Sequence, residues 1–131
     1  MIYFFLGLII VLILAGIAIL VFHKKKKLSL EACSLGCQKI KNTQNLDPAH
    51  AILESHKIFV STIKGMFSPD TGDMTAAEIL SQVSGCFKNE HEIWQFHRLR
   101  NQIAHQMDVP VSYEDSQAAR LAFIRALRDL V

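Results

Sequence analysis

The sequence predicts an all-α protein in which an N-terminal transmembrane helix precedes a helical bundle. An uninterrupted apolar run opens the chain, and helix start and stop signals follow one another through the rest of it. No segment of useful length alternates apolar and polar residues with the period of two that is typical of a half-buried strand. With 27 of the 131 residues in the run and its flank, the remaining 104 are enough for one small domain but not for two.

The first predicted element is a transmembrane helix over Ile2–Phe22. This run has no charged residue and no proline, and at about 1.5 Å per residue it covers about 30 Å, the thickness of a bilayer's hydrocarbon core. A signal peptide would carry its positive charge before a shorter apolar region and would end in a small-residue cleavage site. A core helix would have a polar face. The run has none of these features, so we expect residues 1–23 to be a retained membrane anchor.

Four consecutive lysines follow the apolar run and form a basic juxtamembrane flank: Lys24, Lys25, Lys26 and Lys27. Lysine and arginine near the end of a transmembrane segment are retained on the cytoplasmic side. The sequence therefore predicts a single-pass protein of the cell membrane, with its N-terminus outside and its C-terminal domain in the cytoplasm. The flank can also attract anionic lipid headgroups, to which each lysine contributes about 1 kcal/mol.

The domain that follows the flank is mildly acidic. Four of the 14 basic residues lie in the flank, which leaves ten basic residues against all 12 acidic ones, a net charge of −2. The positive charge of the whole chain thus comes from the flank. The domain lacks the basic excess that is typical of a strong nonspecific nucleic-acid binder.

The three cysteines, Cys33, Cys37 and Cys86, are expected to be free thiols, because disulfides are rare in the cytoplasm. Cys33 and Cys37 are one helical turn apart, but no second ligand pair follows at the spacing of a zinc site. They are therefore interpreted as small apolar packing residues.

The histidine pairs His50/His56 and His91/His97 do not have metal-site spacing. Each pair is six residues apart rather than four, so its members do not share one helical face. The sequence also holds no glycine-rich phosphate loop. No metal and no cofactor is therefore expected.

The first two helices after the flank are separated by an N-cap signal. A connecting helix within residues 28–46 is predicted to reach about Asn45. Its apolar positions recur at intervals of three and four, namely Leu30, Cys33, Cys37 and Ile40. Asp47 is an N-cap followed by Pro48 at the first helical position, and these predict a second helix that stops near Ser68. Its buried stripe is Ile52, Phe59, Ile63 and Met66 or Phe67.

Two further helices begin at capping signals. Thr75 and Glu78 match a capping box that opens a short helix ending at Gly85. Asn89 and Glu92, three residues apart, match a second capping box and predict the start of a longer helix. The apolar residues of that helix are Ile93, Trp94, Phe96, Leu99 and Ile103.

The last predicted helix begins at Ser112, after a connector that holds Pro110. Glu114 and Asp115 lie in its first turn, where acidic side chains are stabilised by the helix dipole. Its expected apolar face is Ala118, Leu121, Ala122, Ile124 and Leu127 or Leu130. These elements complete an all-α bundle.

The segment Arg98–His105 reads RLRNQIAH and is followed by QMDVPVSYEDSQAARLAFIRALRDL. It resembles the HEPN domains (higher eukaryotes and prokaryotes nucleotide-binding), whose signature is an Arg, a polar residue, a short gap and a His. Arg100, Asn101 and His105 match this signature, with four residues between the Arg and the His. Upstream, DPAHAILESHKIFVSTIKGM is similar to the helix that precedes the motif in small bacterial members. The resemblance therefore covers about residues 47–131.

The resemblance implies a four- to five-helix bundle that commonly forms homodimers and, in the catalytic branch, a metal-independent endoribonuclease. A histidine can move the proton as the phosphodiester is transferred to the ribose 2′-OH, and an arginine can neutralise the phosphate. Arg100 and His105 suit these roles. They lie about 140° apart around a helix axis, so they reach one phosphate only if the helix breaks before His105 or if two copies pair. Asn101 shares the face of His105 and could orient its imidazole.

Two functions remain open from the sequence. In the first, the domain is a non-catalytic interaction and dimerisation module that brings an unidentified protein partner to the membrane. Arg98 and Arg100 would then oppose the helix dipole, and His105 would cap the last carbonyls. In the second, Arg100, Asn101 and His105 form the catalytic site of a membrane-tethered nuclease that acts on RNA. The acidic domain favours the first function.

Overall fold

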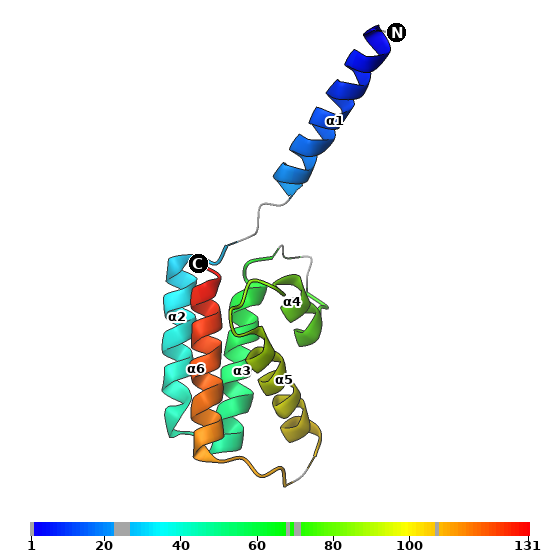
Figure 1. The fold of residues 1–131 in the computed structure, drawn as a ribbon. Helices are drawn as coiled ribbons and strands as arrows, with labels where there is room; N and C mark the ends of the chain where they lie inside the picture. The colour runs from blue at the N-terminus through cyan, green and yellow to red at the C-terminus, as the bar shows by residue number, and fades with distance from the viewer. Residues whose placement is uncertain (1, 23–26, 68, 70–71, 107) are drawn as a thin grey trace.

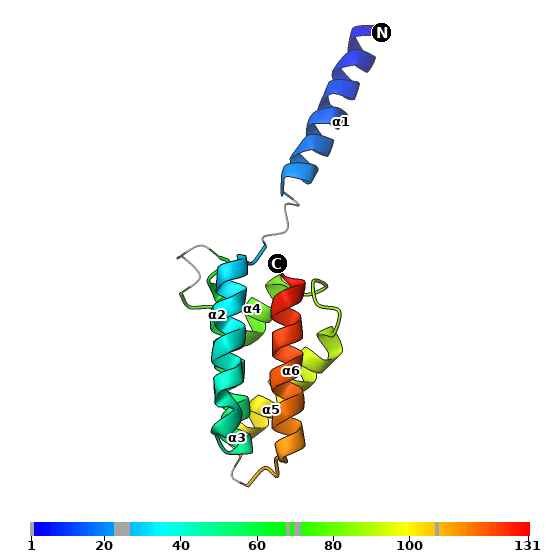
Figure 2. The same ribbon diagram turned by 90° about the vertical axis from the view of Figure 1, so that its left-hand side faces the viewer.

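The chain folds into helices connected by short loops (Figures 1 and 2). The computed structural model describes residues 2–22, 27–67, 69, 72–106 and 108–131. Within these residues it holds six α-helices and no strand, which confirms the all-α class. The helices are α1 (Ile2–Phe22), α2 (Leu30–Lys41), α3 (Pro48–Lys64), α4 (Ala76–Gln82), α5 (Glu90–His105) and α6 (Tyr113–Asp129), and a 3-10 turn at Asn42–Asn45 continues α2.

Helix α1 stands apart from the other five helices (Figure 1). Its side chains are described from Gly7 to Ile17, and its large apolar side chains there are all 51–63% exposed. Within the described part of the chain, no helix is both long enough and apolar enough to cross a membrane. Of the basic flank, Lys27 is described and exposed, whereas Lys24, Lys25 and Lys26 lie outside the described residues.

The other five helices form a bundle around α3 and α6. Helix α2 packs along both of them, α5 packs against both from the other side, and the short α4 packs against α3 (Figures 1 and 2). The largest fully buried apolar side chains come from all five helices: Ile40, Ile52, Phe59, Ile63, Ile79, Leu80, Ile93, Phe123 and Leu127. Every member of this core lies between Leu28 and Leu130, so a fragment of residues 27–131 contains the whole of it.

Most of the predicted helix starts are confirmed. Asp47 accepts a hydrogen bond from the backbone N–H of Ala49 at 3.2 Å, ahead of Pro48. Thr75 and Glu78 form the predicted capping box, and hydrogen bonds from Thr75 hold the pKa of the Glu78 carboxyl below its usual range. Side-chain and backbone bonds of this kind satisfy N–H groups that the first helical turn leaves without partners.

The last helix also starts as predicted. Ser112 is its N-cap, and Ser112 and Asp115 form a second reciprocal capping box at the start of α6. Its hydrogen bonds hold the pKa of the Asp115 carboxyl below its usual range.

Asn89 is the N-cap residue of α5, which confirms the predicted helix start, but the capping box predicted there is wrong. The Asn89 side chain makes no capping bond, and its amide instead donates to the Ala122 carbonyl of α6 at 3.1 Å and to Glu92 at 3.3 Å. Glu92 in turn accepts a bond from Arg125 of α6 at 2.7 Å. Contacts with α6 therefore replace the local capping bonds at this helix start.

The predicted apolar face of α6 is partly wrong. Ala118 and Leu121 are exposed, whereas Ala119, Phe123 and Ala126 are completely buried. The Phe123 ring stacks on Phe59 of α3 with 4.8 Å between centroids. Apolar residues occur on several sides of this helix, and its packing against α2, α3 and α5 decides which of them are covered.

Gly36 allows α2 to pack closely against α3 and α6. A Cβ atom at Gly36 would lie 2.8 Å from Oγ1 of Thr62 and 3.1 Å from Cδ1 of Leu127. The Thr62 hydroxyl is held by a hydrogen bond of 2.8 Å to the Ile58 carbonyl, so it cannot turn away without losing that bond.

Gly36→Ala is expected to lower the free energy of unfolding by about 1 kcal/mol, because overpacking of about 1–3 kcal/mol outweighs the gain of about 1 kcal/mol in helix propensity. Urea unfolding of the 27–131 fragment measures this difference. Gly65→Ala is the matched control, since a Cβ there meets nothing closer than 3.4 Å. Equal stability of the two variants would show that the structure accommodates a Cβ atom at Gly36 without strain.

Candidate functional site

The motif formed by Arg100, Asn101 and His105 lies on the C-terminal half of α5, which packs against α3 and α6. Arg100 and Asn101 are half-buried, and His105 is exposed. The helix continues through His105, and the Gln106 N–H still donates to the Gln102 carbonyl at 2.8 Å. The helix break that would bring Arg100 and His105 together within one chain is therefore absent from the described α5. The two side chains leave this continuous helix about 140° apart.

Arg100 and Asn101 belong instead to a polar network that joins α5 to α3. Arg100 Nη1 donates to Asn101 Oδ1 at 3.1 Å, and the Asn101 amide lies 3.3 Å from His97 Nε2. His97 Nδ1 lies 3.0 Å from Nε2 of His56, on α3. The expectation that Asn101 orients His105 is wrong, because Asn101 bonds to the histidine four residues before it rather than to the one four residues after it.

The donors of this network can be assigned from Arg100 onwards. Because Arg100 can only donate, Oδ1 of Asn101 must accept, and its amide group is left to donate to His97 Nε2. A neutral His97 then carries its proton on Nδ1 and donates it to His56 Nε2. Each hydrogen bond of the network is thus donated in the same direction, from Arg100 toward the buried His56.

The two histidines lie in an apolar environment. His56 is 2% exposed and His97 is 7% exposed. The Trp94 ring meets His97 edge-on at 5.6 Å, and Phe123 meets His56 edge-on at 5.7 Å. Burial, followed by His97 and Arg100, lowers the pKa of His56 to about 3. Burial and the nearby Arg100 and Arg98 also lower the pKa of His97, so both rings are neutral at pH 7.

The histidines that meet in the structure belong to neither of the pairs compared in the sequence, His50/His56 and His91/His97. His56 and His97 are 41 residues apart and come from different helices. The one local signal was that His97 and Asn101 are four residues apart and therefore share a helical face. Nothing in the sequence indicated that His56 would meet them.

The side chain of His105 makes no hydrogen bond to any residue that the structure describes, so the carbonyl cap expected of it is not formed. The three cysteines are free thiols, as predicted, with Cys33 and Cys37 buried and Cys86 half-buried. In the described ranges no three His, Cys, Asp or Glu side chains are grouped so that they could hold a metal ion.

Comparison of the chain with models of known protein families, with curated proteins and with solved structures found no match.

Proposed function

We propose that this chain is a single-pass membrane protein whose HEPN-like bundle is a non-catalytic interaction and dimerisation module on the cytoplasmic side. The observation that supports the proposal is that two residues of the motif are part of a polar network inside the bundle. Arg100 and Asn101 hold the buried His97 and His56 in place, and so connect α5 to α3. A motif used in this way stabilises the bundle.

The membrane part of the proposal is supported by α1. Its 21 residues include no charged side chain. The finding that no helix could cross a membrane holds for the described residues only, and in α1 the described side chains reach from Gly7 to Ile17, where the large apolar ones are more than half exposed. A helix that is apolar all round needs an apolar environment, and burial in a bilayer would supply one. The lysines that follow it favour a cytoplasmic bundle.

Membrane fractionation tests this anchor. The full chain is expected to remain in the membrane pellet after alkaline carbonate washing, because the apolar surface of α1 would be exposed to water on extraction. The 27–131 fragment is the matched control and is expected in the supernatant. Release of the full chain by carbonate would contradict a spanning helix.

The interaction role predicts different outcomes for the motif residues. Asn101→Ala is expected to lower the free energy of unfolding by about 1–2 kcal/mol, because it leaves the half-buried Arg100 and the buried His97 without their shared partner. His105→Ala is the matched control on the same helix. It is expected to change stability by no more than about 0.5 kcal/mol, because the side chain is exposed.

The alternative, a metal-independent endoribonuclease, needs two copies, because Arg100 and His105 leave one continuous helix in different directions. The 27–131 fragment is expected to leave RNA intact in the presence of EDTA. Cleavage that depends on His105 would contradict the non-catalytic proposal and would favour a site shared between two chains. Sedimentation equilibrium at the same concentration measures whether the fragment is dimeric.

A further inference from the structure

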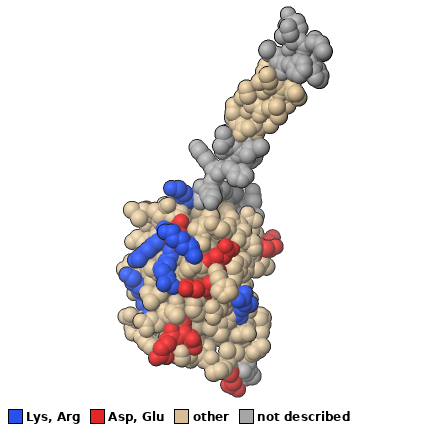
Figure 3. All heavy atoms as spheres, in the orientation of Figure 1, with Lys and Arg blue, Asp and Glu red and all other residues tan. Residues whose placement is uncertain are grey.

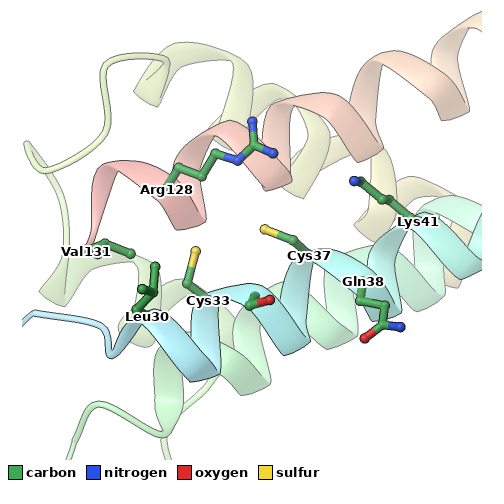
Figure 4. Close-up of a pocket in the computed structure, with 8 residues that line it drawn as sticks. Leu30, Cys33, Cys37, Gln38, Lys41, Arg128 and Val131 are labelled. Atoms are coloured by element: carbon green, nitrogen blue, oxygen red, sulfur yellow. The ribbon is translucent and has the colours of Figure 1, made fainter.

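A pocket of about 530 Å³ lies between α2 and the C-terminal end of α6 (Figure 4). Its lining is Leu30, Cys33, Ser34, Cys37, Gln38 and Lys41 from α2, with Arg128 and Val131 from α6 and the residues after it. The thiols of Cys33 and Cys37 point from α2 toward α6, and Arg128 lies across from them (Figure 4). Two buried thiols therefore lie beneath a pocket that has one cation on each helix.

The pocket combines apolar surface with unpaired positive charge. Leu30 is 73% exposed and Val131 is 41% exposed, so both present apolar surface to solvent. Among the described residues neither Lys41 nor Arg128 has a carboxylate partner. Asp129, next to Arg128, is held elsewhere, because it accepts from the backbone N–H of Lys88 at 2.9 Å and pairs with its ammonium group at 3.8 Å.

Basic side chains gather on the side of the bundle that α2 and α6 form, on the left of Figure 3. The expected ligand is therefore an anion with apolar parts. A phosphate group suits the guanidinium of Arg128 and the ammonium of Lys41. Apolar atoms beside the phosphate would cover Leu30 and Val131.

The connection to α1 places this pocket near the proposed membrane. Leu28 is 4% exposed, and its N–H donates to the Leu130 carbonyl at 2.7 Å, which attaches the start of the bundle to the end of α6. Six residue steps separate Leu28 from Phe22, and a chain of that length spans at most about 22 Å. The end of the bundle that holds Leu30, Arg128 and Val131 therefore stays within reach of the lipid headgroups.

We propose that the pocket binds an anionic phospholipid of the membrane in which α1 is inserted. Arg128 and Lys41 contact the phosphate, and Leu30 and Val131 contact the apolar part of the lipid beside it. The inference rests on the proposed membrane span. It gives the bundle a fixed orientation at the bilayer surface, with the α2–α6 side turned to the lipid.

The two buried thiols report whether the pocket is occupied. The full chain with Cys86→Ser is reconstituted into vesicles of phosphatidylcholine, with or without phosphatidylglycerol, and labelled with N-ethylmaleimide at mildly alkaline pH. Labelling of Cys33 and Cys37 requires an empty pocket. If the lipid fills about two-thirds of the pockets, labelling is expected to be roughly threefold slower in the anionic vesicles. Equal rates in the two kinds of vesicle would overturn the proposal.

Variants separate the pocket from the vesicle surface. Arg128→Gln combined with Lys41→Gln is expected to remove the difference in labelling rate between the two kinds of vesicle. Lys39→Gln is the matched control, because Lys39 lines a different groove, between α2 and α3, and is expected to retain the difference. If the double variant also retained it, the slowing would be a property of the anionic surface, and the pocket would not be the site.

Two further experiments test whether the phosphate belongs to a lipid and whether α1 anchors the chain in the vesicles. Inorganic phosphate added to neutral vesicles is expected to leave the labelling rate unchanged, and protection equal to that of the lipid would overturn a lipid ligand. Flotation with both kinds of vesicle tests the span separately. A chain that fails to float contradicts the proposed function together with this inference, whereas a chain that floats without thiol protection contradicts this inference alone.

Discussion

Phe123→Ala is expected to lower the free energy of unfolding of the bundle by about 3–5 kcal/mol, a large part of the about 5–15 kcal/mol that holds a domain of this kind folded. Phe123 is completely buried. Its ring stacks on Phe59, meets Phe96 edge-on at 6.2 Å and lies against His56. Truncation would therefore leave a cavity where α3, α5 and α6 meet, and would remove one wall of the histidine pair.

Leu121→Ala is the matched control, since Leu121 lies two residues away on the same helix and is 51% exposed. Its expected cost is within about 0.5 kcal/mol. Urea unfolding of the 27–131 fragment, followed by circular dichroism, compares the two. A larger loss for Leu121 than for Phe123 would mean that the face of α6 predicted from the sequence is the buried one.

The free energy of unfolding is expected to fall as the pH drops from about 6.5 toward 3, because His56 and His97 are neutral in the native state. The pKa of His56 is lowered from 6.5 to about 3, mainly by burial. Between these values the unfolded chain binds a proton that the folded chain does not bind, so acid favours unfolding. Above pH 7 both states are neutral, and this contribution no longer changes with pH.

The slope from His56 alone is up to about 1.4 kcal/mol per pH unit, and His97 adds to it because its pKa is lowered as well. The groups that face this pair from the surrounding helices are Arg98, Arg100, Asn101 and Trp94 of α5 and Phe123 of α6. Of these, the two arginines disfavour a protonated histidine, and no carboxylate bonds to the pair among the described residues.

His56→Gln isolates this effect, since glutamine keeps an acceptor for the His97 N–H and does not titrate. Carboxylates such as Asp115 and Glu78 also make the fold less stable in acid, and they are unchanged in the variant. The variant is expected to lose less stability between pH 6.5 and pH 4 than the parent, as measured by urea unfolding at each pH. His50→Gln, at an exposed position on the same helix, is expected to keep the parent's slope. Identical slopes for the parent and His56→Gln would mean that His56 can be protonated without loss of the fold.

The helix starts show how much of the fold follows from short stretches of sequence. Asp47, Thr75 and Ser112 were identified as caps because a capping side chain bonds to backbone N–H groups within three residues of itself. Helix α5 also begins after Asn89, as predicted, but the capping bonds expected of the Asn89 side chain are not formed. That side chain bonds to Ala122, 33 residues away, and a local pattern holds no information about such a partner.

The motif on α5 shows the same difference between features that a short stretch of sequence predicts and features that depend on contacts between helices. Arg100, Asn101 and His105 could be identified as candidates from their spacing, and the sequence also indicated the constraint that one helix would separate Arg100 from His105. The partners of Arg100 and Asn101 were not predictable, because the His56–His97 pair exists only once α3 and α5 are packed together.

The amino-acid sequence was sufficient to predict the all-α class, the places where α3, α4, α5 and α6 begin, and the separation of an apolar N-terminal run from an acidic bundle. These properties depend on hydrogen bonds and periodicities that extend over one or two turns of chain. Three features became visible only in the folded chain: which face of α6 is buried, that Asn101 of the motif bonds to a histidine pair, and that Cys33 and Cys37 share a pocket with Arg128. Each of these depends on contacts between residues that are far apart in the chain, and the packing of the helices determines which of those contacts form.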